Sequence, residues 1–308
     1  MIKEKNKKTI HFILPGGGVR GCFQAGFIYQ LRKNYSDYFE IYQVDGTSVG
    51  ALNGMALLFQ DYEKIKELWF SIKSIDDVFD PWTNRLLWYK IKTAYNGFYQ
   101  KSFCQNNGLR NLVSQNIQYI QQDLLDKYHC VVSNIYTGDF EYINGKDPNL
   151  HEFIIASSSP WIISPPVEIN NHLYIDGGLL QTYPTKNIPK SNADIKLLIG
   201  YDTTHLNKIG MAGANMITYL ARLIDIGRLN HNNIENLHRL INEHNIHSIE
   251  NPLDYPFLDF SQERIIQGFD LGIEAANKFA AEVFTNNLMI QADPEKNHSN
   301  PSINMEIS

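Results

Sequence analysis

Gly46-Thr47-Ser48-Val49-Gly50 is the stretch that decides the fold, because it lies between a predicted strand and a predicted helix. The strand is residues 40–45, which carry β-branched and aromatic side chains, and the apolar residues 49–59 are compatible with a helix. A serine between two such elements, with glycines two positions before and after it, is typical of a nucleophile elbow. The simpler alternative is a tight turn in which Ser48 is a helix N-cap.

A glycine-rich loop lies upstream of the elbow. Residues 9–14 predict a strand that runs directly into Pro15-Gly16-Gly17-Gly18-Val19-Arg20-Gly21, and the apolar residues 25–31 predict a helix. The amides of successive glycines are not shielded by side chains, so they can converge on an anion, which the helix dipole also favours. The anion is either a cofactor phosphate or a tetrahedral oxyanion.

The phosphate alternative has specific support in the sequence. Gly16, Gly18 and Gly21 match the dinucleotide-binding pattern G-x-G-x-x-G, and Asp45 ends the second predicted strand at about the position of a ribose-binding acid. However, the same short span also delivers Ser48. One loop can hardly hold a pyrophosphate while a nucleophile occupies the adjacent strand end. We therefore favour the oxyanion and expect no cofactor.

Two further motifs lie in the middle of the chain. Asp176-Gly177-Gly178 follows a short predicted strand at 172–175, where the glycines let the backbone turn sharply and bring Asp176 close to another strand end. Asp-Gly is also an ordinary hairpin signal. Residues 154–160 (Ile-Ile-Ala-Ser-Ser-Ser-Pro) pass from apolar to small side chains, which indicates a rigid, irregular segment that could line a pocket.

Taken together, these motifs resemble the patatin-like phospholipase family. They occur in the family order, and the resemblance spans about residues 9–200. A weaker family segment is Asn107-Gly108-Leu109-Arg110-Asn111-Leu112. The resemblance implies a three-layer α/β/α fold with a central, mostly parallel sheet, and the pattern of residues 211–285 adds a helical C-terminal region. The resemblance also implies a serine–aspartate dyad without a catalytic histidine.

The resemblance assigns roles to individual residues. Ser48 would be the nucleophile that forms an acyl-serine, and Asp176 the general base. The oxyanion hole would comprise Gly16, Gly17 and Gly18. Ser158, Ser159 and Pro160 would form a wall of the pocket. The positions that support the motifs would be Arg20, Gly21, Gly46, Gly50, Gly177 and Gly178. Arg20 would either brace the loop or face a lipid phosphate. The implied reaction is hydrolysis of fatty-acyl esters of phospholipids or lysophospholipids.

Two other classes of function remain open. One is a soluble carboxylesterase or thioesterase, either of the same patatin-like type or of the α/β-hydrolase type. The α/β-hydrolase type would use a Ser-His-Asp triad behind the same elbow. None of the downstream histidines stands in a strand-to-loop context, and none has a metal-binding spacing such as H-E-x-x-H: His205, His231, His238, His244 and His247. We therefore expect no metal. The other class is a catalytically silent protein that binds lipid or a protein partner.

The composition agrees with an enzyme that acts on lipid esters and does not bind nucleic acid. The 308 residues carry a net charge of −6, which gives no nucleic-acid footprint, and the three cysteines indicate a reducing compartment. We find neither a signal peptide nor a stretch of about 20 apolar residues that could span a membrane. The expected location is the cytoplasm or the membrane periphery. Signal-less export from a bacterium and a need for an activating protein stay open.

The sequence predicts one catalytic core with additions. Residues 1–8 form a basic tail, 9–205 the core, 206–285 a helical region packed on the core, and 286–308 a polar tail predicted to be disordered. Within the core, 62–103 is rich in aromatic residues and lysine, and is either an interfacial lid or an ordinary packed helix. Later strands are predicted at 130–133, 140–143 and 195–199, the last of these being the final core strand.

Overall fold

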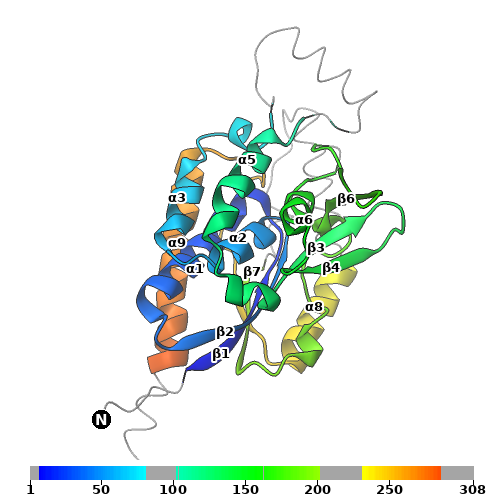
Figure 1. Cartoon of the computed structure of the whole chain (residues 1–308). Coiled ribbons are helices and arrows are strands. Elements are labelled where there is room, and N and C mark those ends of the chain that lie inside the picture. The colour runs from blue at the N-terminus through cyan, green and yellow to red at the C-terminus, as the bar shows by residue number, and fades with distance from the viewer. Residues whose placement is uncertain (1–6, 81–101, 103, 162, 202–230, 286–308) are drawn as a thin grey trace, which may run out of the picture.

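A computed structural model describes residues 7–80, 102, 104–161, 163–201 and 231–285 (Figure 1). Within this part of the chain, eight strands form one sheet in the order β5-β6-β3-β2-β1-β7-β8, and β4 also pairs with β3. The strands are β1 (Lys8–Leu14), β2 (Phe39–Thr47), β3 (Tyr128–Asn134), β4 (Phe140–Asn144), β5 (Val167–Ile169), β6 (His172–Asp176), β7 (Ile195–Tyr201) and β8 (His247–Glu250).

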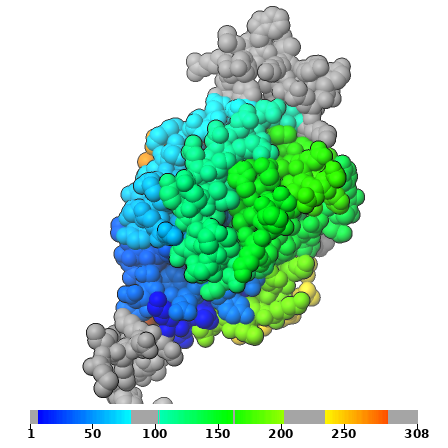
Figure 2. Space-filling model, in the orientation of Figure 1, coloured from blue at the N-terminus to red at the C-terminus, as the bar shows by residue number. Residues whose placement is uncertain are grey.

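Helices cover both faces of the sheet. The described helices are α1 (Gly21–Tyr35), α2 (Val49–Leu57), α3 (Glu63–Ser71), α5 (Asn107–Asn116), α6 (Leu150–Ser157), α8 (His231–Glu243) and α9 (Gln262–Ala280). Figure 1 shows α1, α3 and α9 together on one side of the sheet and α8 on the other. Figure 2 shows the same side of the molecule in space-filling form, where the middle of the chain, coloured green, makes up much of this face.

The alternation of side chains along β1 explains the three layers. Ile10, Phe12 and Leu14 belong to the large hydrophobic core beneath α1 and α2. Ile13 points to the other face, where it joins a smaller cluster with Leu198 of β7 and Leu237 of α8. Because successive strand residues point to opposite faces, a strand buried on both faces needs apolar residues at nearly every position. β1 has this composition from Ile10 to Leu14, except for the buried His11, whose ring is hydrogen-bonded to Asp45.

The sheet is parallel at its centre and antiparallel toward one edge. β1 pairs in parallel with β2 and β7, and β3 pairs in parallel with β2. β3 pairs antiparallel with β4 and β6, and β5 pairs antiparallel with β6. The predicted fold class, a three-layer α/β/α arrangement with a largely parallel sheet, is therefore confirmed.

Two predictions of local structure are wrong. The strand at 195–199 is not the last, because His247–Glu250 forms β8 and pairs in parallel with β7. This strand escaped prediction because it is short and polar, and two of its four residues are exposed. Residues 154–157 are also not irregular: they complete α6, and the chain leaves the helix only at Ser158. The small serines fit here because α6 approaches the end of β2 closely.

Parts of several predictions lie outside the described residues. Residues 81–101, at the centre of the suggested lid, are among them, as are most of the basic tail, residues 206–230 and the polar tail from 286. The beginning of the 62–103 segment is described and contains α3, whose Leu68 and Trp69 are buried. In the described part of the chain, no helix combines the length and apolarity needed to cross a membrane.

Candidate active site

The turn between β2 and α2 has the backbone geometry of a nucleophile elbow. Ser48 adopts φ 58° and ψ −129°, an unfavourable conformation for a residue with a side chain, and α2 begins at the next residue. The neighbouring glycines allow the close approach of strand and helix. A Cβ on Gly46 would lie 2.4 Å from the Gly50 carbonyl oxygen, and one on Gly50 would lie 2.0 Å from that of Leu14.

Strand β3 brings the elbow serine to Asp176. Its residue Val131 pairs with Thr47 of β2, and the next residue, Val132, pairs with Asp176 of β6. The other edge of β3 is occupied by β4, so β2 and β6 share one edge and meet end to end. β2 runs parallel to β3 and β6 runs antiparallel, so their carboxyl ends face each other. Ser48 Oγ donates a hydrogen bond of 2.7 Å to Asp176 Oδ2.

The Asp176 carboxylate is held on both oxygens. The Gly178 amide donates to Oδ1 at 2.7 Å, so this turn fixes the carboxylate plane while Oδ2 receives Ser48. The Asp176 amide donates to the Ser159 carbonyl oxygen at 3.0 Å, and Ser133 Oγ donates to the Asp176 carbonyl oxygen at 3.0 Å. A carboxylate fixed in this way can accept a proton from Ser48 without reorientation.

Serines at the end of α6 support the elbow. Ser157 Oγ accepts the Ser48 amide at 3.0 Å and donates to the Val131 carbonyl oxygen at 2.7 Å, while Ser158 Oγ donates to the Ser48 carbonyl oxygen at 3.0 Å. Ser157 was not among the predicted site residues. Its only sequence signal is its place in the small-residue block, and its role depends on a contact 109 positions along the chain.

The predicted pocket wall is only partly correct. Ser158 and Pro160 line the pocket beside Ser48, together with Trp161. Ser159 does not: its side chain is fully buried, donates to the Ile155 carbonyl oxygen at 2.7 Å and receives Asn106 Nδ2 at 3.3 Å. These two contacts hold the Ser159 side chain in the interior, away from the pocket.

The glycine-rich loop presents its amides next to Ser48. Gly16 donates its amide to the Thr182 carbonyl oxygen at 3.2 Å, and Val19 donates to the Phe257 carbonyl oxygen at 2.8 Å. Between them, the amides of Gly17 and Gly18 have no acceptor within the part of the chain that the structure describes. Both glycines line the pocket. The expectation that the Gly16 amide binds an oxyanion is therefore wrong, because Thr182 already accepts this amide.

Arg20 stabilises this loop from within. The side chain is 2% exposed, and its Nε donates to the Gly17 carbonyl oxygen at 3.5 Å. Of the two roles considered for Arg20, bracing the loop fits this burial and facing a lipid phosphate does not. Gly21 begins α1 against the elbow, where a Cβ would lie 2.4 Å from a Val49 methyl group.

Asp45 is the acid that the dinucleotide-binding alternative would need. It is buried on the face of the sheet away from the pocket and does not line the pocket. Its carboxylate receives His11 Nε2 at 3.0 Å, Gln43 Nε2 at 2.9 Å and Asn187 Nδ2 at 3.1 Å, and His129 Nδ1 lies 3.1 Å away. Burial alone would raise the pKa of Asp45, but the hydrogen bonds from His11 and His129 outweigh it and hold the pKa below its usual value. A ribose cannot reach this carboxylate.

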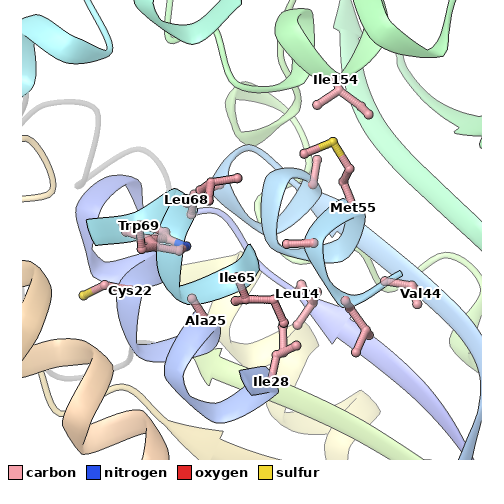
Figure 3. Close-up of a cluster of buried hydrophobic side chains, with 14 of the residues drawn as sticks. Leu14, Cys22, Ala25, Ile28, Val44, Met55, Ile65, Leu68, Trp69 and Ile154 are labelled. Carbon is pink, nitrogen blue, oxygen red and sulfur yellow. The ribbon is translucent and has the colours of Figure 1, made fainter. Parts of the chain in front are cut away.

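The pocket is polar at one end and apolar elsewhere. The polar end consists of Ser48, Asp176, Ser158 and the glycine loop. The apolar lining comes from α2, α3, α5 and the segment before α9, including Leu52, Met55, Leu68, Trp69, Leu109, Leu112, Phe257 and Phe260. The pocket encloses about 1230 Å³ with its open mouth. Met55 reaches from α2 toward Ile154 of α6, and Leu68 and Trp69 extend from α3 (Figure 3).

In the part of the chain that the structure describes, neither a histidine nor a cysteine lines the pocket beside Ser48. No histidine in the described ranges lines the pocket; His238 and His247 are exposed, and the side chains of His205 and His231 lie outside those ranges. The described residues also contain no group of three or more His, Cys, Asp or Glu side chains arranged to hold a metal ion. Burial raises the pKa of the Cys22 thiol to about 12, so this cysteine beside the loop is a packing residue rather than a nucleophile.

Comparison with known proteins identifies a family and similar proteins. The model of the family described as patatin-like phospholipase matches residues 12–187. A lysophospholipase, NTE1 of Meyerozyma guilliermondii, is 25% identical over 205 residues, which cover 64% of this chain and 13% of that protein. The crystal structure of VipD from Legionella pneumophila superposes with a TM-score of 0.40 and 13% identity over 88% of this chain and 67% of VipD. The chain thus spans only a small part of the length of the lysophospholipase.

Proposed function

The chain belongs to the patatin-like phospholipase family, and on that premise we propose that it hydrolyses fatty-acyl esters of phospholipids or lysophospholipids through Ser48 and Asp176. The observation that carries the proposal is the 2.7 Å hydrogen bond from Ser48 Oγ to Asp176 Oδ2 at the mouth of an apolar pocket. The name of the similar lysophospholipase points to the same class of substrate.

The proposed reaction has two halves. Ser48 Oγ attacks the ester carbonyl while Asp176 Oδ2 accepts its proton, and collapse of the tetrahedral intermediate releases the alcohol with that proton and leaves an acyl-serine. Asp176 then takes a proton from water, the resulting hydroxide attacks the acyl-serine, and Ser48 leaves with the proton. The products are a fatty acid and the alcohol part of the lipid.

A carboxylate is a weak base for a serine hydroxyl, since a free aspartate has a pKa of roughly 3.9. Two features of the site compensate for this. The Ser48–Asp176 contact is short and already aligned. The amides of Gly17 and Gly18 lie beside Ser48, where they would stabilise the oxyanion and thereby lower the cost of removing the proton; such donors typically contribute about 10²–10³-fold in rate each.

The pocket lining supports an acyl chain as the group that enters. The polar atoms gather at the Ser48 end, and the remaining walls are aliphatic or aromatic. Val49, Leu52 and Met55 recur along α2, so the pocket follows this helix for about 10 Å at a rise of about 1.5 Å per residue. An alkyl chain attached to the reacting carbonyl would bury its surface there, and each buried methylene would contribute about 0.8 kcal/mol.

Fatty-acid release from lipid tests this proposal. Purified wild type and Ser48→Ala are incubated with vesicles of diacyl phospholipid, with lysophospholipid micelles, and with a water-soluble ester and thioester. Release of fatty acid from either lipid by wild type, and its loss in Ser48→Ala, is the expected result. Asp45→Asn serves as the matched control, because it changes another buried aspartate that lies outside the pocket.

The other arms separate the alternatives. Turnover of the soluble substrates alone identifies an esterase or thioesterase, or a phospholipase that requires an activating partner, and adding a cell extract to the vesicles tells these two apart. If no substrate is turned over and Ser48→Ala still binds vesicles in a flotation assay, the protein is a catalytically silent lipid-binding protein. Flotation of the wild type also tests peripheral membrane contact, the location that a lipid substrate would require.

A further inference from the structure

The segment between β8 and α9, residues 251–260, contacts the glycine-rich loop although it is remote in sequence. We call this segment the C-terminal brace. It lies beyond residues 12–187, which match the family model, and none of its residues belongs to a catalytic motif. Three of its side chains, Phe257, Leu258 and Phe260, also line the pocket. The brace therefore touches both the loop and the space where a substrate would lie.

The brace holds the three residues that follow Gly17. The Phe257 carbonyl oxygen accepts the Val19 amide at 2.8 Å, and Asn251 Nδ2 donates to the Arg20 carbonyl oxygen at 3.3 Å. Gly18 has φ +57°, and a Cβ there would lie 2.2 Å from the Phe257 carbonyl oxygen. The loop is thus in close contact with the brace at Gly18 and is hydrogen-bonded to it through the next two residues, Val19 and Arg20.

Asn251 anchors the brace itself. Its side chain is buried, with 4% exposed, and its Oδ1 accepts the Leu253 amide at 3.1 Å, which forms a turn of the Asx type. Its own amide donates to the Tyr201 carbonyl oxygen at the end of β7 at 2.9 Å. A single residue therefore links the end of the sheet through its backbone amide, and the brace and the glycine-rich loop through its side chain.

The remainder of the C-terminal region fixes the brace from the other side. Helix α9 lies against α1 (Figure 1), and the contact is so close that a Cβ on Gly26 of α1 would lie 1.9 Å from the Phe269 carbonyl oxygen. Tyr255 of the brace approaches Cys22 of α1 at 3.5 Å and donates to the Arg264 carbonyl oxygen at 2.9 Å. The brace has little freedom to move independently of the loop.

We propose that Asn251 is a positioning residue for the hydrolysis: by holding the Arg20 carbonyl and the brace, it sets the direction of the Gly17 and Gly18 amides toward the oxyanion. The inference rests on the proposed function. Oxyanion donors act only when they are aimed at the place where the charge develops, and small displacements weaken them. Loss of the Asn251 contact should therefore lower kcat and leave KM nearly unchanged, because the acyl pocket is retained.

The test compares three variants at a temperature well below their unfolding midpoints. Asn251→Ala removes both side-chain contacts, while Asn251→Asp keeps an acceptor for the Leu253 amide and replaces the donor to Arg20. The matched control is Asn134→Ala. Asn134 is 2% exposed and its Oδ1 accepts the Tyr136 amide at 2.9 Å in a turn of the same type, but it does not contact the loop.

In both Asn251 variants, kcat should fall about tenfold while KM stays within about twofold of wild type. The rate at which a fluorophosphonate labels Ser48 should fall by a similar factor, because this probe forms a tetrahedral adduct. Asn134→Ala should match wild type in both rates. Unchanged rates in Asn251→Ala, or an equal loss of rate in Asn134→Ala, would overturn the positioning role of Asn251 and leave the proposed function standing. Full activity in Asn251→Asp would show that the Arg20 contact is not used. A wild type that neither labels nor turns over would overturn the proposed function as well.

Discussion

Two buried aspartates lie near the ends of strands that meet along β3, and their surroundings differ. Asp45 of β2 receives hydrogen bonds from His11, Gln43 and Asn187 on the face of the sheet away from the pocket. Asp176 of β6 receives Ser48 Oγ and the Gly178 amide, and it lines the pocket. The Asp45 carboxylate is enclosed by side chains of its own strand, of β1 and of a loop, whereas the Asp176 carboxylate faces a hydroxyl and a cavity.

The difference teaches how similar residues acquire different roles. A carboxylate surrounded by donors stabilises the fold but has no position for a reacting atom. A carboxylate bonded to a strained serine beside unused amides can take up a proton during a reaction. The sequence motif G-x-G-x-x-G with a following acid assigned a possible ligand role to Asp45, and the side-chain alternation of β2 excludes it.

The largest expected effect is on activity at Ser48 and Asp176. Ser48→Ala and Asp176→Asn should each lower kcat/KM for the preferred ester by about 10⁴-fold, because each removes one partner of a unit that acts together. Asp45→Asn should stay within about threefold of wild type. Initial rates on a water-soluble ester measure this, with thermal unfolding as the check on folding. Comparable losses in Asp45→Asn and Asp176→Asn would remove the distinction between the two carboxylates.

The next effect is on stability, and here the larger loss is expected at Asp45 rather than at the active site. Asp45→Ala should lower the free energy of unfolding by about 3 kcal/mol, because it leaves buried donors of His11, Gln43 and Asn187 without their acceptor. Ser48→Ala should lower the free energy of unfolding by less than about 1 kcal/mol, or even raise it, because it removes only one hydrogen bond and does so at a strained position of the active site. Urea unfolding followed by circular dichroism measures both. A larger loss in Ser48→Ala than in Asp45→Ala contradicts the comparison.

A smaller effect concerns the apolar end of the pocket. Met55 is fully buried and lines the pocket two turns along α2 from Ser48. Met55→Phe should shift the preferred acyl chain to a shorter length and lower turnover of the longest chains by about tenfold, because added volume there displaces the chain end. Leu57→Phe in the same helix is the control, since Leu57 is buried but does not line the pocket. Identical chain-length profiles in wild type and Met55→Phe would place the acyl chain elsewhere.

The smallest effect is a pH dependence of stability. The pKa of Asp45 is lowered in the folded protein, so its contribution is fully present above the unfolded pKa of roughly 3.9 and is lost as the pH falls through the lower folded value. The stability difference between wild type and Asp45→Asn should therefore narrow below about pH 4. Urea midpoints of both proteins between about pH 3 and 7 test the sign. A difference that widens on acidification would contradict it.

Local patterns in the sequence predicted the elbow and the glycine-rich loop, because each depends on contiguous residues. The layered fold and the role of Asp176 were predicted from the family resemblance. Other features depend on tertiary contacts. Ser157 reaches Ser48, and Asn251 reaches Arg20, across long stretches of chain, and no local pattern marks either. The Gly16 amide is occupied only because Thr182 folds back onto it. β8 was missed because its polar residues follow no hydrophobic alternation.

Peptide mapping by mass spectrometry after fluorophosphonate treatment distinguishes the two aspartates at the level of chemistry. Wild type, Asp45→Asn and Asp176→Asn are treated for equal times, and the modified residue and the labelling rate are determined. We predict one adduct on Ser48 at similar rates in wild type and Asp45→Asn, and labelling in Asp176→Asn slowed by at least about 100-fold. An adduct on another residue, or Ser48 labelling in Asp176→Asn at the wild-type rate, would contradict the proposed dyad.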